Sequence, residues 1–221
     1  MCFSAEADFV SGAVIGVIGV VTLTKVQKPR ELALGILPLA FALHQIVEGF
    51  VWQSLSDPAP HRGDGVAVYI YVVFAWVVLP ILAPLAILLV ERDRRRRNAM
   101  WIFVAFGSLA GVYLLGAVMS NDITAHIAEH TIQYGGAGKY ADIATGLYVI
   151  ATCGAPLVSS HPKIRWFGVA NVFAVAVIAA IQAEGLTSVW CAWAAVVSVL
   201  IYAQFVSWRR RDREPRPLAV V

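Results

Sequence analysis

The chain has 221 residues, of which 59% are apolar and 14% charged, and its mean hydropathy is +0.73. So little charge cannot cover the surface of a soluble domain of this length, and the composition indicates a helical membrane protein with several spans. A membrane β-barrel is excluded because the short segments of alternating polarity that it needs are missing. The first apolar segment has no basic region before it and no cleavage site after it, so we expect a retained helix and not a signal peptide.

Seven apolar segments reach the length of about 20 residues that a spanning helix needs. They are residues 8–26, 31–54, 66–90, 99–120, 140–159, 165–183 and 186–208. We therefore predict an all-α polytopic membrane protein with one transmembrane domain over residues 1–208. A basic tail over residues 209–221 is predicted to be disordered. Gly12 and Gly16 form a small-residue pair that should let the first helix approach a neighbour closely.

Basic residues set the predicted orientation. With the N-terminus outside, only Arg62 and Lys139 of the seventeen Lys and Arg residues fall on the outer side. The inner loops and the tail hold Lys25, Lys28, Arg30, Arg92, Arg94, Arg95, Arg96, Arg97, Lys163, Arg165, Arg209, Arg210, Arg211, Arg213 and Arg216. The positive-inside rule therefore predicts seven spans in the cytoplasmic (inner) membrane, with the N-terminus out and the C-terminus in.

The second apolar segment carries polar side chains where lipid-facing residues are expected. In residues 43–52, LHQIVEGFVW, the spacing places His44, Glu48 and Trp52 on one helical face, with Gln45 beside them. A carboxylate in hydrocarbon costs a few kcal/mol unless it faces the bundle interior, so Glu48 is a candidate functional residue. In the alternative interpretation, Glu48 and His44 only join helices by hydrogen bonds, and Trp52 is an interfacial anchor.

The long connection over residues 121–139 contains HIAEH at positions 126–130, which matches the H-x-x-E-H pattern of a class of zinc hydrolases. On a helix, His126 and His130 would share one face and could bind one metal ion, with Glu129 as the base. The alternative is an amphipathic interfacial helix with no metal. A third ligand would have to come from His44, Glu48 or Cys2.

Two cysteines are expected on the outer side. Cys2 follows the initiator methionine, whose removal would expose an amine and a thiol that together act as a nucleophile or chelate a soft metal. Cys191 lies beside Trp190 in the outer half of the last span. A disulfide between Cys2 and Cys191 and a free inert thiol are the alternatives. Cys153 is interpreted as a packing residue.

Four short motifs support a resemblance: the opening Met1-Cys2-Phe3-Ser4-Ala5, Gln45-x-x-Glu48-Gly49-x-x-Trp52, Ser159-Ser160-His161, and Ser188-Val189-Trp190-Cys191. Together they resemble a family of small bacterial membrane proteins that open Met-Cys-Phe-Ser and have no established activity. The resemblance covers nearly the whole chain and implies a single seven-helix domain. It gives more weight to Cys2, Gln45, Glu48, His130, Trp190 and Cys191 than to His44 and His126.

The candidate residues predict a polar site that faces outward. We interpret it as the site of a metal-dependent membrane hydrolase, which acts on a lipid or small molecule from the outer side. The metal would polarise a carbonyl and activate water, with Glu48 or Glu129 accepting the proton. Zinc is expected, with copper as the second choice. The expected metal ligands are Cys2, His44, Glu48, His126, His130 and Cys191, and the expected binding residues are Gln45, Trp52 and Trp190.

A non-enzymatic role is the alternative: a receptor, a metal or cofactor carrier, an oligomer, or a subunit of a larger membrane complex. A proton path through Glu48 ranks last, since the inner half of the bundle has no matching acid. The arginine runs are expected to set the topology and to contact anionic heads of the lipid bilayer. Nucleic-acid binding is not expected, because no aromatic or structured element accompanies them.

Overall fold

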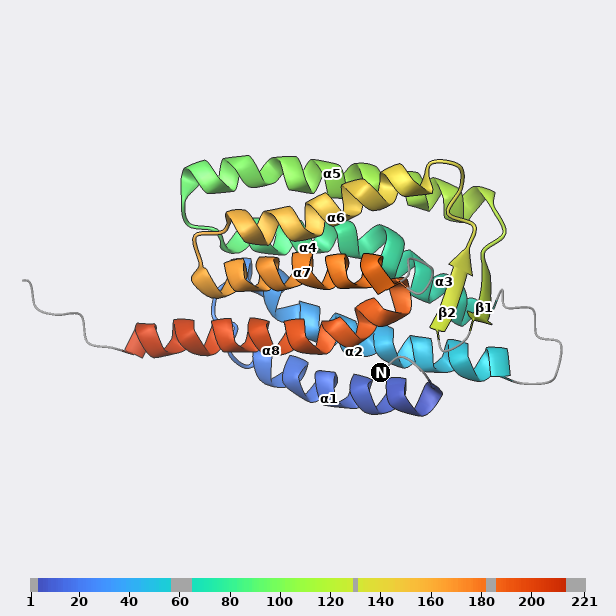
Figure 1. Cartoon of the computed structure of the whole chain (residues 1–221). Helices are drawn as coiled ribbons and strands as arrows, with labels where there is room; N and C mark the ends of the chain where they lie inside the picture. Colours follow the sequence, from blue (N-terminus) through green and yellow to red (C-terminus); the bar gives the residue numbers. More distant parts are fainter. Residues whose placement is uncertain (1–3, 57–64, 129–130, 182–185, 214–221) are drawn as a thin grey trace, which may run out of the picture.

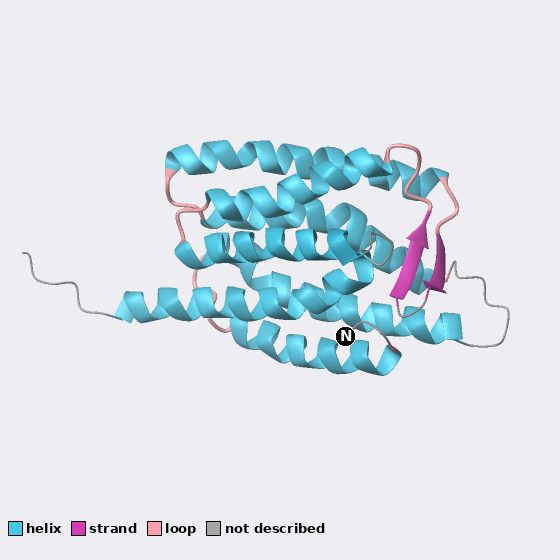
Figure 2. Cartoon of the chain, viewed as in Figure 1, coloured by secondary structure: helices cyan, strands magenta, loops and turns pink. Residues whose placement is uncertain are grey.

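The structure is a computed structural model that describes residues 4–56, 65–128, 131–181 and 186–213, without the side chains of 178–192. The chain is mostly helical, with one antiparallel hairpin (Figures 1 and 2). Its elements are α1 (Ala5–Leu23), α2 (Pro29–Ser56), α3 (Val66–Val72), the π-helical η1 (Val73–Val78), α4 (Leu79–Val90), α5 (Arg94–Ser120), β1 (Thr124–Ala128), β2 (Thr131–Gly135), α6 (Ala141–Val158), α7 (Pro162–Ile181) and α8 (Leu186–Arg213).

The long helices lie side by side along one direction (Figure 1). Helices α3, η1 and α4 follow one another without a break and act as one rod over Val66–Val90. Along the described parts of the chain, successive rods run in opposite directions. One end of the bundle, here called the hairpin end, carries β1 and β2. The other end, here called the basic end, carries the α1–α2, α4–α5 and α6–α7 connections.

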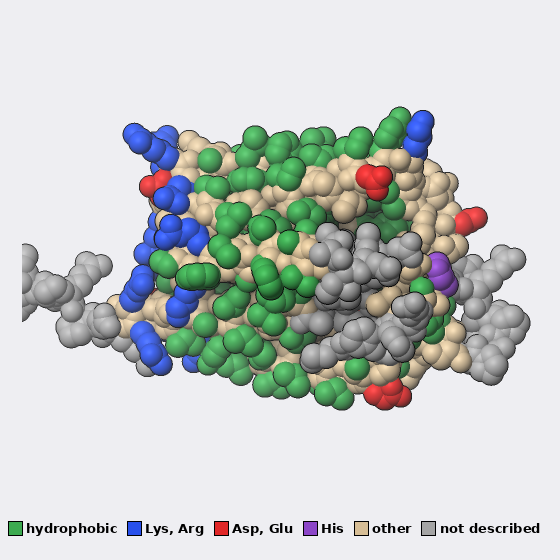
Figure 3. Space-filling view, viewed as in Figure 1, with side chains coloured by type: hydrophobic (Ala, Val, Ile, Leu, Met, Phe, Trp, Pro, Cys, Tyr) green, Lys and Arg blue, Asp and Glu red, His purple; other side chains and the backbone are tan. Residues whose placement is uncertain are grey.

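The outer surface of the bundle suits a membrane. Among the described residues, five helical segments are long and apolar enough to cross one: α1, α2, the Val66–Val90 rod, α5 and α6. Figure 3 shows apolar side chains over the middle of the visible face, and Lys and Arg side chains gathered at the basic end. Large apolar side chains such as Val17, Val112 and Phe173 are about two-thirds exposed, at 66–67%. A membrane location accounts for this exposure, because lipid covers these side chains at no cost.

Two predictions from the sequence need correction. Residues 121–139 contain a β-hairpin, with Thr124 paired to Gly135 and Ala128 to Thr131, so the fold is not purely helical. Buried and exposed side chains alternate along the hairpin, as is typical of strands: Ala125 and Ile132 are buried, and His126 is exposed. The predicted disordered tail also begins too early, since α8 continues to Arg213.

Glycines on α1 allow it to lie directly against α2. A Cβ atom at Gly19 would come within 2.7 Å of the Leu39 nitrogen, and one at Gly12 within 3.1 Å of the Ala42 carbonyl oxygen. At Gly16 the nearest atom is the Ala42 Cβ, at 3.7 Å. The predicted close approach of the first helix is therefore confirmed, and a third glycine extends it. Small residues of this kind let helix backbones meet in lipid, where packing replaces the hydrophobic effect.

Helix α5 approaches the Val66–Val90 rod at the point where prolines interrupt the rod's hydrogen bonds. Pro84 has no N–H to bond the Pro80 carbonyl, so this oxygen is not used within the helix. Gly107 lies against it, and a Cβ atom there would be 1.9 Å from the Pro80 oxygen. Gly111 lies similarly against the Val77 oxygen, at 2.9 Å. Gly107 thus covers a carbonyl group that lipid could not satisfy.

We expect Gly107→Ala to destabilise the bundle by about 1–3 kcal/mol, the usual cost of overpacking, because α5 must move away from the Pro80 carbonyl. Gly116→Ala is the matched control on the same helix, because nothing lies within 4 Å of its added methyl group. Thermal unfolding in detergent, followed by circular dichroism, measures both. Equal melting temperatures for the two variants would contradict the close contact.

Candidate functional site

The polar side chains of α2 lie inside the bundle. Gln45 is 1% exposed, Glu48 is fully buried, and His44 is 9% exposed. Trp52 is also buried, at 6% exposure, among Val51, Val68 and Tyr71. The interpretation of Trp52 as an interfacial anchor is therefore wrong. The helix brings these groups together by their spacing, as the sequence predicted.

Asp8 on α1 joins this group. Its side chain is fully buried, and the Gln45 amide nitrogen donates a hydrogen bond to its Oδ1 atom. We name Asp8, His44, Gln45 and Glu48 the buried acid cluster. The sequence analysis missed Asp8, because an acid near the start of a helix usually lies in solvent. One signal was available: Asp8 precedes Gly12 by four residues, so it lies on the glycine face of α1.

A stack of aromatic rings connects the cluster to the hairpin. The His44 ring lies 4.0 Å from the Tyr71 ring with 16° between their planes, and Tyr71 lies 4.6 Å from Tyr134 of β2. Phe74 contacts the His44 ring at 4.7 Å. Among the described residues, no group forms a hydrogen bond with the His44 Nδ1 atom. This buried nitrogen can accept a bond from a ligand or, as a neutral imidazole, bind a metal ion.

The described part of the H-x-x-E-H pattern, residues 126–128, lies on strand β1 and not on a helix. His126 is exposed, and its Nε2 atom lies 3.0 Å from the Gln133 Oε1 atom on the paired strand. Neither the predicted metal-binding helical turn nor its alternative, an interfacial helix, therefore begins at His126. The strand pairing of this connection instead satisfies the hydrogen-bonding groups of its backbone.

Several predicted site residues cannot be placed. Cys2, Glu129 and His130 lie outside the described residues, and so do the side chains of Trp190 and Cys191. Within the described part of the chain, no group of three or more His, Cys, Asp or Glu side chains is arranged to hold a metal ion. Cys153 is buried at 4% exposure and is a free thiol, in agreement with a packing role.

A second polar cluster lies at the basic end and joins two connections. Glu91 accepts hydrogen bonds from the backbone nitrogens of Arg92 and Asp93 and from the hydroxyl groups of Ser159 and Ser160. The Ser160 nitrogen adds another, at 2.7 Å. The His161 Nδ1 atom lies 3.9 Å from Glu91, and the His161 ring packs edge-on against Trp208. This cluster therefore fixes the α4–α5 and α6–α7 connections and α8 to one another.

Ionisation of this basic-end cluster depends on its surroundings. Burial alone would raise the pKa of Glu91, but the hydrogen bonds from Ser160, Asp93 and Ser159 hold it below its ordinary value. Burial lowers the pKa of His161, and Arg92, Arg211 and Arg30 lower it further against the opposing effect of Glu91. The preferred state is thus a charged carboxylate beside a neutral imidazole.

Arg209 also takes part in the structure of the basic end. It forms an ion pair with Glu31 and donates hydrogen bonds to the Lys25 carbonyl at 2.7 Å and the Gln27 side chain at 2.9 Å. Its side chain is 9% exposed, so this arginine belongs to the bundle and not to a solvated tail. Sequence reasoning missed the role because Arg209 begins an arginine run.

Comparison with known proteins identifies the family and goes no further. Residues 1–218 match a family of unknown function (DUF6629), and the chain belongs to this family. The comparison with curated proteins gave no match, and neither did the comparison with solved structures. The predicted resemblance to an uncharacterised family that covers the whole chain is confirmed.

Acid should weaken the basic-end cluster. Because the folded-state pKa of His161 lies below its ordinary value of 6.5, its contribution to stability is present above pH 6.5 and is lost as the pH falls. We therefore expect the stability advantage of the wild type over His161→Gln to shrink as the pH falls from 6.5 towards 4.5. Denaturant unfolding at several pH values measures it. An advantage that grows on acidification would instead show that an imidazolium–Glu91 ion pair dominates.

Proposed function

We propose that this member of the family is a seven-span protein of the cytoplasmic membrane, and that its buried acid cluster belongs to the site of a metal-dependent hydrolase. Seven helical rods alternate in direction along the described residues. The connections at the basic end and the helix turns beside them carry ten of the seventeen lysines and arginines. By the positive-inside rule, the basic end is cytoplasmic and the hairpin end faces outward. This orientation places the cluster in the outer half of the membrane.

One observation carries the proposal: two fully buried carboxyl groups, Asp8 and Glu48, lie on adjoining helices, and the Gln45 amide donates a hydrogen bond to the Asp8 carboxyl. Buried acids in a membrane bundle are costly and commonly mark an ion or substrate site. The nearby His44 Nδ1 atom has no hydrogen-bond partner among the described residues, and it supplies a nitrogen donor of the kind zinc prefers.

Oxygen and nitrogen donors together favour zinc over magnesium or calcium. We propose that Cys2, His130 and Cys191 complete the coordination; their side chains lie outside the described residues. Thiolate ligands from the two cysteines would make copper the second choice.

Hydrolysis would use the cluster as follows. The metal ion supplies a polarised, readily deprotonated water. Glu48 would accept a proton from water as the water oxygen attacks the carbonyl carbon of an ester or amide, and it would then return the proton to the leaving oxygen or nitrogen. Glu129 is the other acid proposed for this role. A substrate from the outer leaflet, either a lipid or a small amphiphile, is the class that such a site can reach.

A non-enzymatic role is the second candidate, and the enclosure of the cluster favours it. None of the four side chains of the cluster is more than 9% exposed, which suits a bound ion or a packed subunit interface better than rapid exchange of substrate. A carrier or a complex subunit would keep the same metal ligands without the catalytic step.

Metal analysis tests the site. We expect protein purified without chelators to hold about one zinc ion per chain, and Glu48→Gln and Asp8→Asn to lose most of it, because the first removes a carboxylate donor and the second removes the carboxylate that holds the Gln45 amide. Glu6→Gln is the matched control, since Glu6 lies on the same turn of α1 as Asp8 but is exposed. Elemental analysis by mass spectrometry gives the metal content. A wild-type protein without metal, or full metal content in Glu48→Gln, would reject the site.

Turnover separates the two candidate functions. We expect zinc-loaded protein in nanodiscs to cleave fluorogenic lipid esters or amides, with activity removed by a chelator and restored by zinc. Glu48→Gln should lower the rate by at least about 10²-fold, because it removes both a zinc donor and the proton acceptor. Stoichiometric zinc without any cleavage would reject the hydrolase and leave the carrier.

A further inference from the structure

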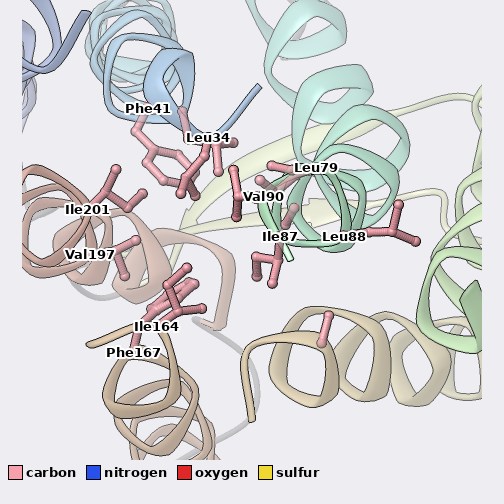
Figure 4. Close-up of a cluster of buried hydrophobic side chains, with 14 of the residues drawn as sticks. Leu34, Phe41, Leu79, Ile87, Leu88, Val90, Ile164, Phe167, Val197 and Ile201 are labelled. Carbon is pink, nitrogen blue, oxygen red and sulfur yellow. The ribbon is translucent and has the colours of Figure 1, made fainter. Parts of the chain in front are cut away.

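Trp52 of α2 belongs to a small apolar cluster at the hairpin end of the bundle. The larger core holds side chains of α2, α4, α7 and α8, among them Phe41 and Val197 (Figure 4). Trp52 lies outside it, in the cluster that contains Tyr71 and the buried side chains of the hairpin. The Tyr71 ring also stacks on the ring of His44. The surroundings of Trp52 are therefore continuous with those of the buried acid cluster.

The indole N–H of Trp52 has no hydrogen-bond partner among the described residues. The side chain is 6% exposed, and its Nε1 atom is buried. An indole nitrogen can only donate a hydrogen bond, and a buried one usually finds an acceptor. Trp193 follows this rule, since its Nε1 atom donates to the Asn171 Oδ1 atom at 2.7 Å. A buried donor without an acceptor costs stability, so an acceptor supplied by a ligand would be bound favourably at Trp52.

Helical spacing places this donor one turn from Glu48. Trp52 follows Glu48 by four residues, so the two side chains lie on one face of α2, about 6 Å apart along its axis. Long side chains on a helix usually lean back over the preceding turn, which favours an indole ring directed towards Glu48. A donor beside this proton acceptor stands where an acyl group must lie for attack by water.

The chemistry proposed for the buried acid cluster requires such a donor. Asp8 and Glu48 offer carboxyl oxygens, and the Gln45 amide donates to Asp8. The His44 Nδ1 atom is proposed as a metal ligand. When water adds to a carbonyl carbon, the electron pair of the C=O π bond moves to the oxygen, which becomes negative. Beside two carboxyl groups this charge is unfavourable unless a donor stabilises it.

We propose that the Trp52 indole N–H binds the carbonyl oxygen of the acyl compound that occupies this site. The inference deepens the proposed function, on which it rests for the class of ligand, and it makes Trp52 a substrate-binding residue. The hydrogen bond forms when the ester or amide binds, and it strengthens as negative charge develops on the oxygen. A non-enzymatic protein that binds an acyl compound would use the same contact without the chemical step.

Ultraviolet resonance Raman spectroscopy tests the contact without zinc or turnover, because an indole vibration changes frequency when the N–H forms a hydrogen bond. The difference between the spectra of the wild type and Trp52→Phe isolates Trp52. In dodecyl maltoside, a detergent without a carbonyl group, we expect an N–H that has no hydrogen bond. Excess N-methyldodecanamide should shift it to the bonded frequency, and dodecane, the control ligand, should not. An N–H that is already bonded without the amide, or that does not shift with it, would overturn the inference.

Kinetics test the consequence for hydrolysis. We expect Trp52→Phe to keep its zinc and to lower kcat on the fluorogenic ester by about 10²–10³-fold, the usual effect of losing one oxyanion donor, with a smaller change in KM. Trp208→Phe is the matched control, because Trp208 is buried to the same extent, at 6% exposure, but packs against His161 at the basic end. It should cleave the ester at the wild-type rate.

A second replacement separates the hydrogen bond from the loss of volume. Benzothienylalanine in place of Trp52 keeps both rings but has sulfur instead of the N–H, and it should lower kcat as much as Trp52→Phe does. Wild-type kcat in this protein, or loss of its zinc, would overturn the inference. A wild type that shows the Raman shift but cleaves no ester would reject the hydrolase and leave the contact standing, so the two failures give different results.

Discussion

The hydrogen bond from Gln45 to Asp8 depends on how closely α1 lies against α2. Both side chains are short relative to the usual 8–10 Å between helix axes, and they meet because glycines face α2 along the same side of α1. In turn, the bond gives the Asp8 carboxyl a partner in a place where burial without one would be costly. The burial of Asp8 therefore depends on the close packing of the α1 glycines against α2. A larger residue at Gly12 or Gly19 would separate the helices and leave Asp8 without its hydrogen bond from Gln45.

The two ends of the bundle use buried acids differently. At the basic end, Glu91 receives hydrogen bonds from three backbone nitrogens and two hydroxyl groups, which is the pattern of a structural anchor. At the hairpin end, the buried acid cluster includes the His44 Nδ1 atom, which has no hydrogen-bond partner among the described residues. Fully satisfied networks hold a fold together, whereas a buried donor or acceptor left for a ligand is typical of a site. This contrast, and not the presence of acids alone, favours function at the hairpin end.

The sequence predicted the helices well because apolar length is a strong signal in a membrane protein. The rod over residues 66–90 was predicted with the same limits that the structure has, although its π-helical segment was not. Asp8 and Arg209 were missed for a common reason: each lies near the end of a helix, where a charged residue is ordinarily solvated. Only tertiary packing shows that Asp8 faces α2 and that Arg209 reaches Glu31. The hairpin was missed because a short motif at helical spacing was given more weight than its β-branched neighbours.

Helix α2 contributes both to the apolar core and to the buried acid cluster. Phe41 of the core lies four residues before Gln45 and therefore one helical turn, about 6 Å, further towards the basic end. Pro38 lies three residues before Phe41, and it leaves the Leu34 carbonyl without its helical partner. Because Gln45 donates a hydrogen bond to Asp8 and the glycines of α1 lie against α2, a shift of α2 would break these contacts unless α1 moved with it. The position of the buried acid cluster therefore depends on the packing of both helices.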